Sequence, residues 1–405
     1  MIIGPCTVVT GGSEPAVFEE AAVRVVGAHI AQVGPAGSIA SAHPDETLWP
    51  ARGRVLLPGL VNTHAHLARH LARGLGLHRD ADWKRYDDAL SPDDVHWAAK
   101  AALVEGVRHG VTAVCDFHCS SACVDRALSE VVSSAASVGV RIAACYGAAE
   151  DDAPAERRAA LEESASFARE LTRRRSARLI GMLGVRAATL AGVDTLMRDA
   201  LEVAGERHAV HVDLTLDATP AEPWSGGLWP PGASPGLWAH AERAPRGLLG
   251  VLQARGDSLT ATGTAAPALA REAALAWGSD AGVNAPPIAD ASRGVAADRR
   301  QIEAHYERIF VHGARWASHH FGRGLGTISP GAPADLVLMD YRPATEFSSR
   351  TVLDHLWAGL LRAPVSGVMV AGTILVDNGQ LVSVDEREVA ARARECAGRV
   401  WERLG

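Results

Sequence analysis

The feature that most constrains the fold is a regular alternation of short apolar runs and helical stretches between about residues 55 and 280. Eight runs have the length and composition of buried strands: Leu56–Thr63, Val111–Phe117, Val140–Tyr146, Leu179–Val185, Ala209–Leu214, Gly236–His240, Ser258–Thr262 and Leu275–Ser279. Most of the stretches between them are typical of helices. Eight such strand–helix units in one continuous segment predict an α/β fold, a closed (β/α)₈ TIM-like barrel.

The two ends of the chain have a different texture. Residues 1–54 and 326–385 contain short strands broken by Gly and Pro, and residues 386–405 are typical of an amphipathic helix. We therefore expect a composite β-sandwich domain formed by 1–54 plus 326–385, a barrel at 55–325 and a closing helix. The Pro-rich segment 219–236 stands where the helix after the fifth strand belongs, and its prolines predict a loop.

Composition excludes several classes of protein. The chain has 40 Lys and Arg against 47 Asp and Glu, a formal net charge of -7, so it lacks the clustered cations that a nucleic-acid partner requires. No apolar run approaches the roughly 20 residues that span a bilayer, and the first residues do not resemble a signal peptide. The six cysteines form no CxxC pair. We expect a cytoplasmic protein with reduced thiols and no membrane or nucleic-acid partner.

The strongest local signal is the segment PGLVNTHAH at residues 58–66. His64 and His66 are two positions apart on a strand, so both point to the same face, at the carboxyl end where barrel active sites lie. Two such imidazoles can chelate one divalent ion. An isolated pair of this kind is more often a pair of hydrogen-bonded core residues.

Three residues later in the sequence make a metal site the better interpretation of this histidine pair. His211 lies on the fifth predicted strand, His240 ends the sixth, and Asp280 follows the eighth. Because the carboxyl ends of barrel strands meet at one mouth, these side chains converge with the two earlier histidines. Burying so many polar groups without a common ligand is costly. The pattern predicts a metal site.

At this point the sequence resembles the amidohydrolase superfamily. The resemblance rests on PGLVNTHAH, HGVTAVCDFH, the GSD after the eighth strand and the C-terminal PGAPADLVLMDY and VMVAGTILVDNGQLVSVDEREV. It extends over nearly the whole chain and is strongest to SsnA-type aminohydrolases and the related chlorohydrolase and guanine-deaminase group. The family fold is a (β/α)₈ barrel with a β-sandwich built from both chain ends.

The resemblance implies specific roles for the converging residues. One catalytic metal, zinc first and iron second, would be bound by four side chains: His64, His66, His211 and Asp280. Asp280 would also take the proton of the metal-bound water, and His240 would orient the resulting hydroxide or polarise the substrate. Binuclear members use a carboxylated lysine on the fourth strand, and the fourth strand here has no lysine, which favours a single metal.

The chain also departs from the family pattern. The HxxE glutamate that protonates the leaving group is replaced by Leu214; Asp213, on the face of His211, either replaces it or lies too close to the metal to do so. A substrate-contacting histidine after the fourth strand is replaced by Arg186, which either binds an acidic substrate group or forms a salt bridge at the barrel rim. The HNP-like motif after the seventh strand is absent from residues 261–264.

Three further residues are expected to contact the substrate. Trp224 and Trp229, in the Pro-rich loop, would stack on a planar ligand or close the pocket, the alternative being packing against the rim. His118 ends the second barrel strand and should face the same mouth.

These observations predict a metal-dependent hydrolase of C–N bonds, an aminohydrolase or deaminase acting on a small nitrogen-containing ring. Two alternatives remain: non-hydrolytic chemistry at the same metal, as in a lyase, cyclase or isomerase, and a non-catalytic protein that keeps the fold. By analogy with other barrels we expect a homodimer.

Overall fold

The computed structural model describes residues 1–77, 79–205, 208–216, 234–262, 273–281, 286 and 298–405. The chain divides into two compact units, each assembled from separate parts of the sequence. The first, the β unit, comprises Met1–Val61, Gly106–Ala113 and Ala285–Ser383. The second, the barrel unit, comprises Asn62–Glu105, Val114–Asn284 and Val384–Gly405. Among the described residues, no helix is both long enough and apolar enough to cross a membrane.

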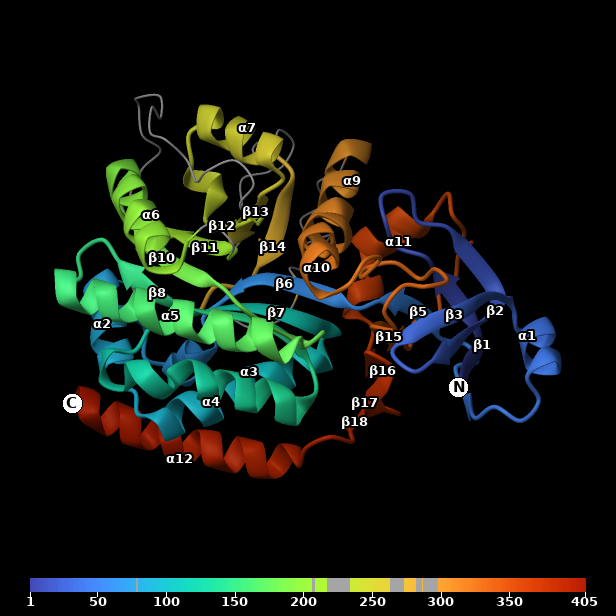
Figure 1. The fold of residues 1–405 in the computed structure, drawn as a ribbon. Coiled ribbons are helices and arrows are strands. Elements are labelled where there is room, and N and C mark those ends of the chain that lie inside the picture. Colours follow the sequence, from blue (N-terminus) through green and yellow to red (C-terminus); the bar gives the residue numbers. More distant parts are fainter. Residues whose placement is uncertain (78, 206–207, 217–233, 263–272, 282–285, 287–297) are drawn as a thin grey trace. The chain divides into compact units, whose positions relative to one another are not determined.

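The barrel sheet runs in the order β14-β13-β12-β11-β10-β8-β7-β6 (Figure 1). Its strands are β6 (Leu60–Ala65), β7 (Val111–His118), β8 (Arg141–Ala149), β10 (Leu183–Ala187), β11 (Val210–Leu214), β12 (Leu237–Ala239), β13 (Ser258–Thr262) and β14 (Leu275–Gly278), and the short β9 (Leu179–Gly181) pairs with β8. The strand pairs from β8 to β14 are parallel. The predicted barrel, with eight strands in sequence order, is confirmed.

Backbone hydrogen bonds connect the first strand of this sheet to the segment after the last. The amides of Ser279 and Asp280 donate to the carbonyl of His64, at 2.8 and 3.1 Å, and the His66 amide donates to the carbonyl of Asp280 at 3.1 Å. The side chain of Asn62 supports the same connection, because its Oδ1 accepts from the Ser279 amide at 3.1 Å. The closing bonds therefore bring Asp280 next to both histidines of the HxH segment.

Helices surround the strands of the barrel unit (Figure 1). They are α2 (Asp80–Asp88), α3 (Pro92–Arg108), α4 (Val124–Val138), α5 (Pro154–Arg174), α6 (Leu190–Ala204), α7 (Arg246–Arg255) and α12 (Glu386–Leu404), with 3₁₀ turns η1 (Leu67–Ala72), η2 (Ser121–Cys123) and η3 (Ala241–Arg243). In α4, Leu128, Val131 and Ala135 recur at helical spacing and are all buried, which packs this helix on the sheet.

The closing helix α12 is fixed to the barrel unit by specific contacts. Trp401 Nε1 donates to the carbonyl of Leu71 in η1 at 2.9 Å. Arg403 pairs with Asp94 at 2.5 Å, and Asp94 also accepts from the Ser91 amide at 2.9 Å at the start of α3. The start of α3 therefore also anchors the C-terminal helix.

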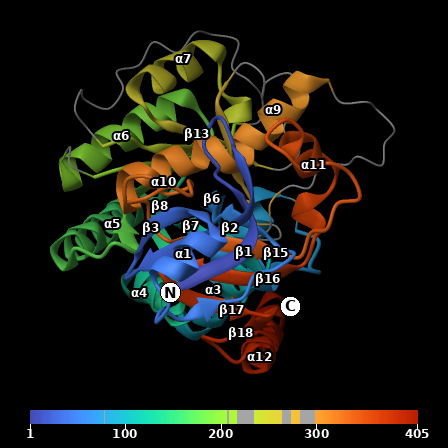
Figure 2. The ribbon, with the colours of Figure 1, turned by 90° about the vertical axis from the view of Figure 1, so that its right-hand side faces the viewer.

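The β unit contains a mixed sheet in the order β18-β17-β16-β15-β5-β1-β2-β3, with β4 beside β1 (Figure 2). Its strands are β1 (Ile2–Val9), β2 (Val17–Val26), β3 (His29–Pro35), β4 (Leu48–Trp49), β5 (Val55–Pro58), β15 (Leu336–Met339), β16 (Val365–Val370), β17 (Thr373–Asp377) and β18 (Gln380–Leu381). The unit also contains α1 (Ala36–Ala42), α9 (Arg299–Glu307), the π-helical η5 (Arg308–His312), α10 (Gly313–Phe321), α11 (Val352–Ala358) and η6 (Leu360–Arg362). The predicted second β domain, built from both chain ends, is present as this sheet.

The first strand predicted from the sequence is divided into two strands in the structure. The run expected as Leu56–Thr63 divides at Gly59 into β5, which belongs to the β sheet, and β6, which begins the barrel. A Cβ at Gly59 would lie 2.2 Å from Thr112 Oγ1, so only glycine fits where the chain passes between the sheets. The sequence hides this division because both strands are buried and together read as one apolar run.

Candidate metal centre

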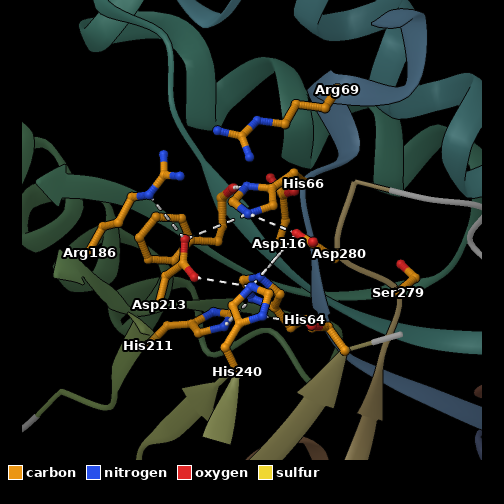
Figure 3. Close-up of polar contacts among 12 residues, drawn as sticks. His64, His66, Arg69, Asp116, Arg186, His211, Asp213, His240, Ser279 and Asp280 are labelled. Carbon is orange, nitrogen blue, oxygen red and sulfur yellow. Dashed lines mark hydrogen bonds and ion pairs between the residues drawn. The ribbon is translucent and has the colours of Figure 1, made fainter. Parts of the chain in front are cut away.

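Five side chains converge at the carboxyl ends of the barrel strands (Figure 3). They belong to His64, His66, Asp213, His240 and Asp280. Two overlapping groups of three, His64 with His66 and Asp280, and His64 with Asp213 and His240, hold their ligand atoms within 4.8 Å of one another. His64, His66, His240 and Asp280 were expected to converge, and the residue from β11 in these groups is Asp213 where the sequence predicted His211 as a ligand.

The distances around Asp280 suit a shared cation. Its Oδ1 lies 3.5 Å from His66 Nε2, 3.8 Å from His64 Nε2 and 4.0 Å from His240 Nε2. Two ligands of a tetrahedral centre with bonds of about 2.1 Å are separated by roughly 3.4 Å. The atoms of Asp280 and His66 are thus already spaced as two ligands of one ion.

Hydrogen bonds to strand β7 orient His66. Its Nδ1 lies 2.7 Å from the carbonyl oxygen of Phe117, which can only accept, so Nδ1 carries the proton and Nε2 offers a lone pair. The next amide, that of Leu67, donates to Asp116 Oδ1 at 2.8 Å. Two successive residues of β7 therefore hold the turn at His66 and aim Nε2 at the cluster.

The environment of His64 shows whether these residues fit a metal ion. Its side chain is fully buried, and within the described parts of the chain its Nε2 has no hydrogen-bond partner. A buried polar atom left in that state costs about 1–3 kcal/mol. His64 belongs to both three-residue groups, so a divalent ion bound at its Nε2 would satisfy this atom. The donor set of imidazole and carboxylate suits zinc.

His211 lies deeper along β11. It is fully buried, and its Nε2 is 2.9 Å from His64 Nδ1, while its own Nδ1 finds no hydrogen-bond partner among the described residues. The ring thus contacts a proposed ligand directly and belongs to neither three-residue group. The role of His211 as a fourth ligand stays a prediction.

Burial sets the protonation of these rings. It lowers the pKa of His64 to about 3 and holds the pKa values of His66 and His211 well below the ordinary range. Neutral imidazole is the form that binds metals. His240 differs: burial acts to lower its pKa, but the neighbouring carboxylates of Glu242 and Asp213 outweigh burial and raise it.

The backbone at two site residues is strained. His240 has a φ of 54° and Asp280 a φ of 57°, in the left-handed region that non-glycine residues rarely occupy. Both follow the last residue of a barrel strand, where the chain turns. Such strain persists only when the surroundings hold it, and it gathers at functional sites.

Asp213 sits between three basic groups. Its buried carboxylate has Oδ2 at 3.5 Å from Arg186 Nε and 3.8 Å from His66 Nε2, and Oδ1 at 3.5 Å from His240 Nε2. Leu214, in the place of the missing HxxE glutamate, is completely buried. For Arg186, these distances support the salt bridge at the barrel rim. For Asp213, they place the carboxylate close enough to the clustered histidines to be a metal ligand.

A cavity of about 700 Å³ opens beside the cluster. Its wall includes Lys84, Asp87, Cys119, Tyr146, Glu150 and Arg186, all in the barrel unit. Because Arg186 also pairs with Asp213, the cavity adjoins the proposed metal site. Its volume lies within the usual range for small-molecule pockets.

Of the other predicted substrate contacts, the structure describes only His118. His118 is 1% exposed, its Nε2 is 2.7 Å from Ser120 Oγ, and it is not one of the residues that line the cavity, although Cys119 and Ser120 are. Trp224 and Trp229 lie outside the described residues, as do positions 263 and 264 of the motif after the seventh strand.

The buried state of His118 gives a pH-dependent stability. Burial lowers the pKa of His118 from 6.5 to about 3, so its contribution is complete above about pH 6.5 and is lost as the pH falls, when the unfolded chain takes up the proton. At pH 5 the expected loss is about 2 kcal/mol relative to pH 7. His118→Asn should lack this part of the pH dependence in urea unfolding, whereas the exposed control His29→Asn should keep it. Identical slopes for His118→Asn and wild type would contradict the assignment.

Sequence reasoning missed the residues that hold the clustered side chains in position through hydrogen bonds and close contacts. Asn62 and Asp116 bind backbone amides next to the ligand candidates, and Glu242 and Thr262 contact His240. Asn62 and Asp116 stand inside motifs that the sequence had already singled out, which is the signal that could have identified them. Glu242 stands two residues after His240, but its contact depends on the strained turn between them.

Comparisons with known proteins found similar families and folds. Residues 55–222 match the model of the Amidohydrolase family. A 5-methylthioadenosine/S-adenosylhomocysteine deaminase of Pelotomaculum thermopropionicum is 23% identical over 438 residues, covering 100% of this chain and 99% of that protein. A deaminase of the same name from Moorella thermoacetica is 26% identical, covering 97% of each chain.

Two solved structures share the fold over almost their whole length. Atrazine chlorohydrolase TrzN from Arthrobacter aurescens, complexed with zinc, has a TM-score of 0.71 at 19% identity, with 98% of this chain and 99% of that chain covered. An adenosine deaminase from Xanthomonas campestris with bound zinc has a TM-score of 0.71 at 21% identity, with 99% and 98% covered. The family match over residues 55–222, the full-length relatives and the shared fold all agree with the resemblance to the amidohydrolase superfamily that the motifs indicated.

Proposed function

We propose that this chain is a metal-dependent aminohydrolase that releases ammonia from a small nitrogen-containing ring. The observation that carries the proposal is the set of imidazole and carboxylate atoms directed at one point at the barrel mouth, including the unpartnered Nε2 of His64. One zinc ion would be held by four side chains: His64, His66, His211 and Asp280. His211 would have to turn its ring from His64 toward the ion.

The residues around the ion divide the proton transfers between them. When bound, the metal supplies a Lewis acid and lowers the pKa of water at the site to about 7. Asp280 accepts the proton of the attacking water, since its Oδ1 faces the cluster. His240 Nε2, 4.0 Å from that oxygen, orients the attacking water.

Asp213 passes to the leaving nitrogen a proton that its carboxylate has first taken up from the attacking water. The family glutamate is absent, and Asp213 is the carboxylate on the same strand that faces the cluster, with Oδ1 at 3.5 Å from His240 Nε2. Arg186 holds the other oxygen at 3.5 Å and so fixes the direction of the carboxylate. This arrangement gives Arg186 a positioning role in addition to its place in the cavity wall.

The cavity and the relatives point to the substrate class. A space of about 700 Å³ accommodates a ring with a substituent the size of a nucleoside. The full-length relatives are named as deaminases of 5-methylthioadenosine and S-adenosylhomocysteine. We propose an aminated heterocycle of comparable size, with the amino carbon placed at the cluster and the substituent in the cavity.

A second function uses the same metal without hydrolysis. It is favoured by one observation, the buried Leu214 in the place of the glutamate that protonates the leaving group. A lyase, cyclase or isomerase would not need that proton donor.

Ammonia release from a panel of substrates tests the proposal. Zinc-loaded protein would be assayed with adenosine, 5-methylthioadenosine, S-adenosylhomocysteine, guanine and aminotriazines, with His64→Ala as the control. Release from at least one compound, absent in the control, is the expected result. One zinc per chain with no release would favour the non-hydrolytic alternative, and failure to bind zinc at all would favour a non-catalytic protein.

A further inference from the structure

A partly buried carboxylate lies directly behind His240. Glu242 is 17% exposed, and its Oε1 is 3.6 Å from His240 Nδ1. Thr262, at the end of the neighbouring strand β13, stands between them: its Oγ1 is 2.7 Å from His240 Nδ1 and 3.3 Å from Glu242 Oε1. Three side chains from the ends of two adjacent strands thus form a short hydrogen-bond relay that ends at the candidate site.

The direction of the hydrogen bonds in this relay follows from the donors available. A carboxylate only accepts, so the hydroxyl of Thr262 donates its one proton to Glu242. The same hydroxyl can then only accept from His240, which requires the proton of the neutral ring to be on Nδ1. When the ring is neutral, Nε2, which lies 3.5 Å from Asp213 Oδ1 and 4.0 Å from Asp280 Oδ1, therefore carries the lone pair.

The local backbone makes this contact possible. His240 adopts the left-handed conformation and begins the 3₁₀ turn η3, Ala241–Arg243, and this turn carries Glu242. The other oxygen of Glu242, Oε2, is buried and has no hydrogen-bond partner in the described part of the chain. A strained turn and an under-satisfied, partly buried carboxylate are both costly, which argues that the contact is kept for the site and not for stability.

We propose that Glu242 is a positioning residue that, through Thr262, fixes His240 as the Nδ1-protonated tautomer and so keeps Nε2 as the acceptor that faces the reacting water. The direction of the hydrogen bonds from His240 through Thr262 to Glu242 is a property of the folded protein and needs no substrate. Its effect on turnover rests on the function proposed above.

Glu242→Gln is the informative variant because it keeps the shape and reverses the donors. A glutamine amide can donate to Thr262, whose hydroxyl is then free to donate to His240 Nδ1, which moves the ring proton to Nε2. Nε2 would then present a proton to the site in place of a lone pair. Thr262→Val removes the bridging hydroxyl and serves as a second variant that acts on the same relay.

The test is the tautomer of His240, read from long-range ¹H–¹⁵N spectra of the zinc-loaded protein labelled at histidine, with His240→Asn used for assignment. The expected result is the Nδ1-protonated form in the wild type, the Nε2-protonated form in Glu242→Gln and a mixture in Thr262→Val. Glu130→Gln is the matched control, because Glu130 Oε2 lies 3.2 Å from His96 Nδ1, away from the site. The control should leave the spectrum of His240 unchanged.

Kinetics give a second readout. Loss of an outer partner of a site histidine typically costs 10–100-fold, so kcat of Glu242→Gln should fall by about that factor with KM and zinc content little changed. An unchanged His240 tautomer in both Glu242→Gln and Thr262→Val would overturn the assignment. Because the spectra need no substrate, this outcome is distinct from failure of the proposed aminohydrolase activity, which the substrate panel reports.

Discussion

Asp280→Asn should keep the fold and bind zinc at saturating concentration, yet lose turnover by a factor of about 10²–10⁴, the range expected for a missing proton acceptor. The amide keeps an oxygen in the position that lies 3.5 Å from His66 Nε2. It cannot accept the proton of the attacking water. The backbone of Asp280, which bonds to His64 and His66, is unaffected by the change.

The measurement is kcat on the best substrate of the panel, with zinc content determined on the same sample. Asp257→Asn is a suitable control, because Asp257 is a buried carboxylate that accepts from the Gly236 amide at 2.8 Å, before the start of β12 and so at the opposite end of the strand from the site. Turnover of Asp280→Asn within threefold of the wild type would exclude Asp280 as the proton acceptor.

His64→Ala should reduce bound metal from about one zinc per chain to a small fraction of that value. His64 is the residue common to both groups of converging ligands, so removal of its ring affects both arrangements of the ion. The loss of affinity should exceed the 10–100-fold that is typical for an outer partner of a ligand. Protein purified without added metal or chelator would be analysed by elemental mass spectrometry.

The control for this experiment is His96→Ala, which removes an imidazole that pairs with Glu130. If removal of the fully buried His64 ring prevents folding, His64→Asn keeps most of its volume and a polar atom and still lacks the ring nitrogen. Equal zinc content in His64→Ala and His96→Ala would show that any bound ion lies elsewhere.

The parts of the structure that could be predicted from the sequence are those governed by local periodicity. The barrel strands are short buried runs between helices, and the two-residue spacing of His64 and His66 places them on one face. Their convergence with His240 and Asp280 follows from the rule that barrel strands end at one mouth. No contact between distant residues had to be known for either conclusion.

The remaining features depend on tertiary contacts that periodicity does not encode. The division at Gly59 reflects the approach of Thr112, and the contact of Glu242 with His240 depends on a left-handed turn that sequence patterns do not indicate in a non-glycine residue. The depth of His211 relative to Asp213 is also a matter of packing, since both lie on the same face of β11. These are the features on which the chemistry of the site depends.

The hydrogen bonds between His64, His66 and Asp280 have a consequence for assembly of the protein. The residues proposed to hold the ion are the same ones whose backbones join the first barrel strand to the end of the last. An ion bound there would link two segments that are far apart in the sequence. Separating the first barrel strand from the segment after the last would then require release of the ion. Metal binding at the proposed site would therefore stabilise the closed barrel as well as support catalysis.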